Sequence, residues 1–324
     1  MPLRKIISAL NERKNVLLTG HLSPDGDCIG SMLGLFLAFE GERRGWQMVL
    51  ADPLPYYADF LPSVEKIITP DKINGQPELV VMLDCAETAR AGGEWLEALL
   101  ARADLIVIDH HPGEAPAAVY SYIDAGAAAA AELVCRLLEE GGMEPGQEAA
   151  FCLYAGIAFD TGCFRFANTT WKAMLTASRL LAAGIDGQKA NMNLFERRSL
   201  AGTYMLGAAI SSMEIFCGGK LAAMTIGREA MLKHGARTDD CSNIVSTAMS
   251  VEGVKVALLF EEREKSVKIS LRCRPGYAVN GIARALGGGG HLLAAGAVAE
   301  GDLAAVKERA LALAREMLET VSAE

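Results

Sequence analysis

A chain of 324 residues is longer than one domain of average size and can bury two separate cores. Hydrophobic residues make up 51% of it and charged residues 22%, a balance that excludes an intrinsically disordered chain. The formal net charge of −9 excludes the strong basic excess of proteins that bind along long nucleic acids. A nucleotide ligand, if there is one, is therefore expected to be short and held in a local pocket.

The apolar runs and the cysteines both favour a cytoplasmic protein. The longest apolar runs, such as residues 32–39, are far shorter than the ~20 residues that cross a bilayer. Near the N-terminus only residues 6–10 are apolar, whereas a signal peptide needs ~7–15. The eight cysteines are scattered without a CxxC pair, which is typical of reduced thiols. We expect neither a membrane partner nor a membrane-spanning segment.

The first half of the chain alternates helices with short apolar strands. Helices are expected over residues 3–10, 32–44, 127–141, 147–158 and 171–183, and strands over residues 15–19, 47–51, 78–83 and 104–108. The alanine run at 127–131 is interpreted as no more than a good helix start. Strands that are apolar throughout are typical of a parallel sheet covered by helices on both faces. The pattern predicts an α/β domain over residues 1–184.

The second half has a different pattern. Residues 185–200 are polar and are expected to form a partly helical connector between domains. Beyond them, strands are expected over 221–226, 254–260 and 266–271, and helices over 279–286 and 303–318. The charged residues 261–265 are interpreted as the tip of a hairpin. This predicts a smaller α/β domain over residues 201–324.

Acidic and imidazole side chains follow the apolar stretches of the first half. They are His21, Asp25 and Asp27 after the first strand, Asp84 after residues 78–83, Asp109, His110 and His111 after residues 104–108, and Asp160 after residues 153–159. Ligands of an open parallel sheet bind outside the carboxyl ends of its strands. We therefore expect all these groups to lie at strand ends along one edge of the sheet.

This set of residue types points to divalent metal ions. Crowded carboxylates repel one another and take up protons unless cations lie among them. Two ions would satisfy the cluster, and mixed imidazole and carboxylate ligands favour manganese, with magnesium or cobalt as alternatives. A metal pair acidifies water and clamps a phosphoryl group for in-line attack. Any one of these aspartates could be a helix cap instead; their joint occurrence predicts a metal-dependent phosphoesterase.

Four ordered motifs carry a resemblance to a known family. HLSPDGDCIGS at 21–31, LDCAE at 83–87, DHHPG at 109–113 and FDTG at 159–162 resemble the motifs of the DHH phosphoesterase superfamily. GGGGH at 287–291, preceded by Arg272 and Arg274, resembles its DHHA1 domain. The resemblance covers nearly the whole chain. The compact length is most similar to the branch of bifunctional oligoribonucleases and phosphatases of 3′,5′-bisphosphoadenosine (pAp), rather than to the larger single-strand exonucleases.

The resemblance implies a role for each matching residue. His21 and Asp25 would bind one metal ion, Asp27, His110 and Asp160 would bind the other, and Asp84 would bridge the two. The implied catalytic residues are Asp84, Asp109 and His111. Asp109 would be a further ligand or would orient the histidines, and His111 would face the scissile phosphate as hydrogen-bond donor or general acid.

In the C-terminal domain the resemblance implies a substrate-binding site. Its expected residues are Arg272, Gly288, Gly289, Gly290 and His291. Four glycines free the backbone to expose N–H groups in a concave loop that accepts an anion, and the cationic side chains would add charge-assisted contacts. Family members often have Arg-Ser where this chain has Arg272-Cys273, so the phosphate contact of that serine is not expected here.

The hypothesis that best fits these features is hydrolysis of short RNA oligonucleotides to mononucleotides, with removal of the 3′-phosphate of pAp. The alternatives are a cyclic-dinucleotide or linear-dinucleotide phosphodiesterase, a pyrophosphatase or exopolyphosphatase, and a non-catalytic nucleotide-binding module. A pyrophosphatase needs a densely basic clamp, whereas this C-terminal half offers a glycine loop and a few arginines. No ligand position is lost, which argues against a non-catalytic module. Cleavage polarity stays open, and so does assembly into a homodimer.

Overall fold

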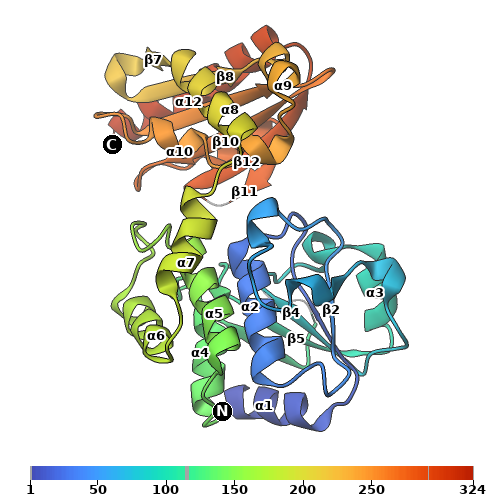
Figure 1. Ribbon diagram of the computed structural model, residues 1–324. Coiled ribbons are helices and arrows are strands. Elements are labelled where there is room, and N and C mark those ends of the chain that lie inside the picture. The colour runs from blue at the N-terminus through green and yellow to red at the C-terminus, as the bar shows by residue number, and fades with distance from the viewer. Residues whose placement is uncertain (1, 114–116, 291, 324) are drawn as a thin grey trace. The chain divides into compact units, whose positions relative to one another are not determined.

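The structure, a computed structural model, describes residues 2–113, 117–290 and 292–323 (Figure 1). The chain forms two compact units, Met1–Arg197 and Arg198–Glu324. Each has its own sheet and its own hydrophobic core, as the predicted α/β class requires. None of the described helices is long and apolar enough to cross a membrane.

The first unit is built on a parallel sheet of six strands. They are β1 (Val16–Thr19), β2 (Gln47–Val49), β3 (Ile67–Ile68), β4 (Leu79–Leu83), β5 (Asp104–Asp109) and β6 (Tyr120–Ile123). Their order is β3-β2-β1-β4-β5-β6, and every neighbouring pair is parallel. The direction in which strands are added reverses between β1 and β4. Ligands of such sheets bind at this switch point, beyond the carboxyl ends of the strands.

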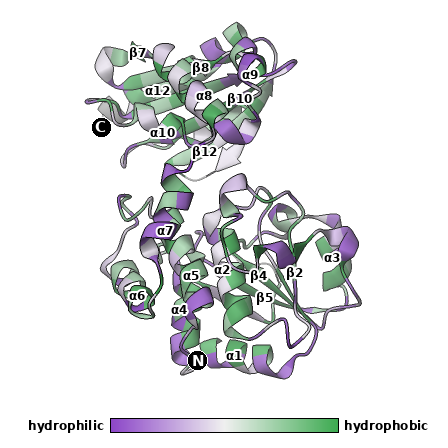
Figure 2. Ribbon diagram, viewed as in Figure 1, coloured by the Kyte–Doolittle hydropathy of each residue, from purple (hydrophilic) through white to green (hydrophobic). Residues whose placement is uncertain are grey.

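Helices cover both faces of this sheet. They are α1 (Pro2–Glu12), α2 (Gly26–Ala38), α3 (Glu94–Leu100), α4 (Ala130–Glu140) and α5 (Gln147–Asp160). Alternate residues of each strand enter different cores: Leu18 and Val81 pack with α2, α4 and α5, whereas Val80 packs with α3. The central strand β4 is therefore hydrophobic along its whole length (Figure 2).

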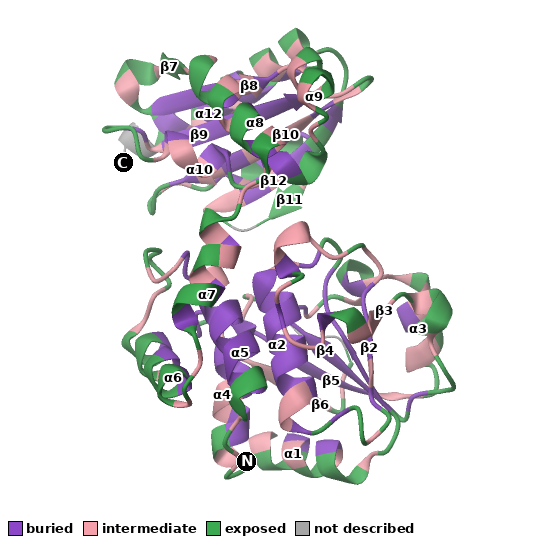
Figure 3. Ribbon diagram, viewed as in Figure 1, coloured by how far each residue is buried: buried purple, intermediate pink, exposed green. Residues whose placement is uncertain are grey.

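Helices α2 and α5 lie in close contact and are almost entirely buried (Figure 3). Two glycines of α2 permit this approach. A Cβ atom on Gly30 would lie 2.6 Å from the carbonyl oxygen of Cys152, and one on Gly34 would lie 2.4 Å from Cγ of Leu153. Both distances are well inside van der Waals contact, so larger residues would push α5 away from α2 and with it Asp160 at the end of α5.

The remainder of the first unit consists of short elements and two more helices. Helical turns occupy Tyr56–Ala58, Val64–Lys66, Pro70–Lys72 and Thr88–Ala91, and the helices are α6 (Trp171–Ala182) and α7 (Gly187–Asn191), followed by a π-helical turn at Met192–Glu196. The segment expected to be the connector packs on this unit as far as Arg197. Ala190 and Leu194 are buried in its core, and Arg197 forms a bidentate ion pair with Asp59.

The second unit has a mixed sheet of six strands covered by helices. The strands are β7 (Glu214–Phe216), β8 (Leu221–Ile226), β9 (Val256–Glu262), β10 (Ser266–Cys273), β11 (Gly289–Gly290) and β12 (Ala294–Glu300), in the order β11-β12-β10-β9-β8-β7. Only β8 and β9 are parallel. Helices α8 (Leu200–Ser211) and α10 (Val245–Ala248) cover one face, and α11 (Asn280–Ala285) and α12 (Leu303–Ala323) cover the other. Helix α9 (Arg228–His234) contacts α8.

The structure differs from the predicted elements in several places. The helix expected over 32–44 starts earlier, at Gly26, because Asp25 caps its first turn. It ends at Ala38. Strands β6 and β12 were not expected. Strand β6 has only four residues, and β12 is rich in alanine, so neither sequence has a clear strand pattern. The supposed hairpin tip at 261–265 begins inside β9: Glu261 is buried and its Oε1 lies 3.1 Å from Nζ of Lys268.

Candidate metal centre

Asp84 lies at the middle of the candidate site. It follows β4 directly, and its φ of 56° places it in the left-handed region that few residues other than glycine adopt. Its backbone N–H donates to the carbonyl of Ile108 at 2.9 Å, which ties the end of β4 to β5. The side chain is buried. The backbone turn and this hydrogen bond hold the carboxylate beyond the carboxyl end of the sheet.

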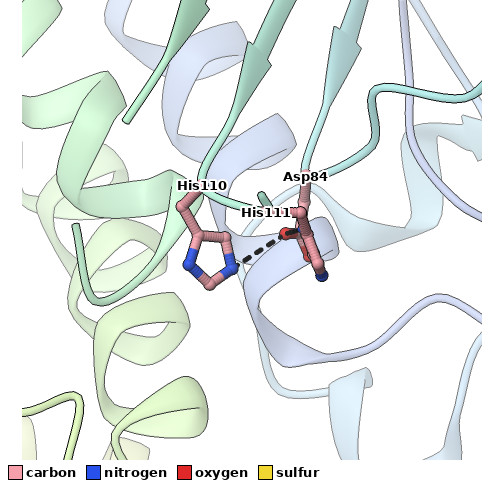
Figure 4. Close-up of side chains that lie close together, drawn as sticks. All are labelled: Asp84, His110 and His111. Carbon is pink, nitrogen blue, oxygen red and sulfur yellow. Dashed lines mark ion pairs between the residues drawn. The ribbon is translucent and has the colours of Figure 1, made fainter. Parts of the chain in front are cut away.

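The two oxygens of Asp84 face two different imidazoles. Oδ2 lies 3.3 Å from Nε2 of His21, which follows β1. Oδ1 lies 3.3 Å from Nε2 of His110, which follows β5 (Figure 4). Both histidines thus present the same ring nitrogen to one carboxylate, from the two sides of the switch point in the sheet.

Around these pairs the described residues form three overlapping groups of ligand atoms, one of which is Asp84, His110 and His111 (Figure 4). The other two are treated as separate clusters because they share no residue. The first cluster is His21, Asp25 and Asp84, and the second cluster is Asp27, His110 and Asp160; within each, one ligand atom per residue lies within 4.8 Å of the others. In the second cluster Nε2 of His110 is 3.1 Å from Oδ2 of Asp160 and 3.9 Å from Oδ2 of Asp27. Asp84 belongs to the first cluster and also contacts His110 of the second, which is the geometry a bridging ligand requires.

The donor set fits divalent cations. Oδ1 of Asp84 is buried, and within the described residues it accepts no hydrogen bond. A buried carboxylate oxygen without such a partner is costly unless a cation lies against it. Nδ1 of His21 lies 2.8 Å from the carbonyl of Leu22, and Nδ1 of His110 lies 3.4 Å from the carbonyl of Ala127. A ring that donates from Nδ1 to a carbonyl presents Nε2 as the ligand atom.

Protonation of these groups shows that the site needs positive charge. Burial opposes ionisation of Asp84, but the imidazoles of His110 and His21 beside it outweigh burial and hold the pKa of Asp84 well below its usual range. Burial would lower the pKa of His110, but Asp160 and Asp84 raise it to about 12. Burial raises the pKa of Asp160 to about 6, against the hydrogen bond from His110. Without metal ions, protons on the imidazoles therefore balance the carboxylates.

We expect the affinity for Mn²⁺ to rise with pH. His110 and a fraction of Asp160 are protonated near neutral pH, and both must lose the proton to bind a cation, so lower pH favours the metal-free form. Each proton released should change the affinity about tenfold per pH unit. Isothermal titration with Mn²⁺ between about pH 6 and about pH 8, in buffers of different ionisation enthalpy, measures the affinity and the number of protons released on binding. An affinity independent of pH would contradict this account.

Asp109 and His111 form a second pair beside the clusters. Oδ1 of Asp109 lies 2.7 Å from Nδ1 of His111 and accepts the backbone N–H of the same residue at 3.1 Å. Nδ1 of His111 is also 3.5 Å from Oδ1 of Asp84. Asp109 is buried, and its carboxylate holds the imidazole in one orientation.

One expectation about the site is wrong. Asp160 does not follow a strand: it is the last residue of helix α5, which packs against α2. A helix was expected over residues 147–158, but its apolar end at 153–159 has no polar face, so periodicity could not place Asp160 at the end of a helix rather than of a strand. Asp25 combines its place in the first cluster with a cap: its Oδ1 accepts the N–H groups of Asp27 and Cys28.

The predicted substrate residues lie in the second unit. Arg272, on β10, donates to the carbonyl of Leu271, and no carboxylate of the described residues pairs with its guanidinium. Cys273 points to the other face, into the core, where its Sγ lies 3.4 Å from the carbonyl of Tyr277. His291 lies outside the described residues.

Part of the glycine run is required by the packing and backbone conformation of the second sheet. Gly289 and Gly290 form β11, which pairs with β12 at the edge of the sheet. A Cβ atom on Gly288 would lie 2.0 Å from the carbonyl oxygen of Gly296, so only glycine fits there. Gly290 has a φ of 135°, which also requires glycine. Strand pairing and backbone conformation thus account for Gly288 and Gly290, and anion binding by the run stays a prediction.

Comparison with known proteins agrees with this geometry. Residues 15–157 match the DHH family, N-terminal domain, and residues 218–320 match the DHHA1 domain. The chain belongs to the DHH family.

Individual relatives match over almost the whole chain. It is 35% identical over 306 residues to the bifunctional oligoribonuclease and PAP phosphatase NrnA of Thermus thermophilus, covering 94% of this chain and 90% of that protein. It is 28% identical over 297 residues to NrnA of Bacillus subtilis, covering 90% and 92%. The solved structure of an exopolyphosphatase-related protein from Bacteroides fragilis superimposes with a TM-score of 0.91 at 24% identity, covering 98% of this chain and 97% of that chain, which shows the shared fold.

Proposed function

We propose that this chain is a two-metal phosphoesterase that hydrolyses short oligoribonucleotides to mononucleotides and removes the 3′-phosphate of pAp. The observation that carries the proposal is the position of Asp84, whose two oxygens face His21 and His110 of the two ligand clusters. The relatives named oligoribonuclease and PAP phosphatase, matched over nine-tenths of the chain, support the substrate class.

The two proposed cations are Mn²⁺ ions, in agreement with the mixed imidazole and carboxylate donors. His21, Asp25 and Asp84 would hold one ion, and Asp27, His110 and Asp160 the other. When bound, such ions supply Lewis-acid chemistry: they acidify water and neutralise charge that develops on a phosphoryl group. The proposed location is the cytoplasm, which agrees with all eight cysteines being free thiols.

His111 has the geometry of a proton donor in this proposal. Asp109 accepts from its Nδ1 and so fixes the orientation of the ring beside Asp84, whose Oδ1 lies 3.5 Å from the same nitrogen. In the second unit Arg272 offers a guanidinium without a carboxylate partner in the described part of the chain, suited to a substrate phosphate.

A substrate panel tests the proposal. With Mn²⁺ present, we expect pAp and RNA dinucleotides to be hydrolysed fastest, and the rate to fall as the RNA grows beyond a few nucleotides. The net charge of −9 offers no basic track along which a long strand could bind. Initial rates with pAp, RNA of increasing length, cyclic di-AMP and pyrophosphate provide the measurement. Faster cleavage of cyclic di-AMP, pyrophosphate or long RNA would assign the chain to one of the alternatives.

A further inference from the structure

The alanine run at residues 127–131 lies against the second cluster. All five alanines are at most 5% exposed, so their methyl groups are packed away from water. Their polar atoms are those of the backbone, at the start of α4 and just before it. Buried backbone groups of this kind must find partners inside the protein. Several of those partners are the metal-ligand residues themselves.

Two ligands of the second cluster contact this segment directly. The carbonyl oxygen of Ala127 lies 3.4 Å from Nδ1 of His110. The N–H groups of Ala130 and Ala131 donate to Oδ2 and Oδ1 of Asp27, at 2.5 Å and 3.0 Å. Asp27 is fully buried, and the two hydrogen bonds from the first turn of the helix fix the orientation of its carboxylate.

The third ligand is connected to the same segment through Asn168. The side-chain amide of Asn168 donates from Nδ2 to the carbonyl of Ala128 and to the carbonyl of Asp160, both at 3.1 Å. One side chain therefore ties the end of helix α5 to Ala128, two residues before α4 begins. All three residues of the second cluster are thus linked, directly or by one bridge, to residues 127–131.

A buried ion pair holds this segment in place. Glu132 is fully buried, and its Oε2 accepts the N–H of Ala128 at 2.8 Å, while its Oε1 pairs with Arg136. Arg136 also pairs with Asp124 at 2.7 Å, and Asp124 accepts the N–H of Gly126 at 2.9 Å. Both ends of the loop before α4 are therefore anchored to the same helix.

The first cluster has no such support from this segment. Nδ1 of His21 lies 2.8 Å from the carbonyl of its own neighbour, Leu22. Asp25 accepts N–H groups from the first turn of α2, the helix that it caps. In the described part of the chain, the side chains of the second cluster form hydrogen bonds with residues 127–131, and those of the first cluster do not. The two clusters are therefore held by different parts of the fold.

We propose that residues 127–131, with Asn168 and Glu132 as positioning residues, set the affinity of one of the two metal sites. They fix the second cluster in its ligand geometry and leave the first cluster unaffected. This inference rests on the proposed two-metal function. It gives the alanine run a role in positioning metal ligands, beyond the good helix start that its composition predicts. Loss of a group that orients metal ligands typically weakens binding about 10- to 100-fold.

Mn²⁺ binding in two backgrounds tests the inference. His21→Ala leaves the second cluster, and His110→Ala leaves the first. We expect Asn168→Ala and Glu132→Gln to weaken Mn²⁺ binding about 10- to 100-fold in the His21→Ala background and to change it less than about twofold in the His110→Ala background. Isothermal titration measures both without any assay of activity. The side chain of Asn168 is exposed, so Asn168→Ala decides the question if Glu132→Gln fails to fold.

Two matched controls keep the result specific. The amide of Asn193 donates to the carbonyl of Lys189 at 2.8 Å, and Glu139, also on α4, forms an exposed pair with Arg179. Asn193→Ala and Glu139→Gln should leave Mn²⁺ binding unchanged. Equal weakening in both backgrounds, or no weakening by Asn168→Ala in either, would overturn the inference. Failure of the parental protein to bind Mn²⁺ would instead contradict the proposed function.

Discussion

Replacing Asp84 with asparagine is expected to lower kcat/KM for an RNA dinucleotide by at least ~10³-fold. Each oxygen of this carboxylate lies 3.3 Å from the imidazole of a different cluster. The amide removes the negative charge and replaces one oxygen with an N–H donor, which repels a cation. Both metal sites therefore lose a ligand in one substitution, and the chemistry that depends on two ions fails.

The measurement is kcat/KM at saturating Mn²⁺, together with the affinity for Mn²⁺. Asp104→Asn is the matched control, because Asp104 lies at the opposite end of strand β5 and pairs with Arg13 in a partly exposed ion pair. Such a pair contributes little to stability, so the control should keep the parental rate. A near-parental rate for Asp84→Asn would show that this carboxylate does not bridge the ions.

Replacing His111 with alanine is expected to lower kcat/KM for the dinucleotide about 10²- to 10⁴-fold, the usual contribution of a positioned proton donor. Hydrolysis of the reporter bis-p-nitrophenyl phosphate should be slowed less, because its leaving group departs without needing a proton.

Arg272→Ala should slow hydrolysis of the dinucleotide about 10- to 150-fold through one lost charge-assisted contact and leave hydrolysis of the small reporter at the parental rate. The four rate constants, measured at equal metal content, separate the chemical step from substrate binding.

Two outcomes would contradict these assigned roles. If Arg272→Ala slowed the reporter as much as the dinucleotide, Arg272 would act in the chemistry or in folding rather than in binding. If His111→Ala slowed neither substrate, the pair of Asp109 and His111 would be structural.

Much of the centre can be predicted from the sequence because parallel strands end at one edge of a sheet. That rule alone brings Asp84 and His110 together, since each directly follows an apolar strand and the two strands are neighbours. The alternation of side chains along a strand likewise predicts that Arg272 and Cys273 face opposite sides of β10.

Other parts of the site depend on contacts that no local pattern reports. Asp160 reaches the second cluster because α5 packs closely on Gly30 and Gly34 of α2, a fit between surfaces distant in sequence. The support of Asp27 and His110 comes from backbone atoms of residues 127–131, whose alanine side chains carry no chemical signal. Strand β6 is short and half-buried, so its sequence shows neither alternation nor a continuous apolar run.

Counting the metal ions that activity requires tests the two-metal centre most directly. The metal-free protein is titrated with Mn²⁺ while bound metal and the hydrolysis of an RNA dinucleotide are measured in the same samples. Because Asp84 faces both clusters, we predict negligible activity in chelator and a rise that follows the second equivalent of bound Mn²⁺. Full activity in chelator, or a maximal rate with one ion bound, would contradict the account.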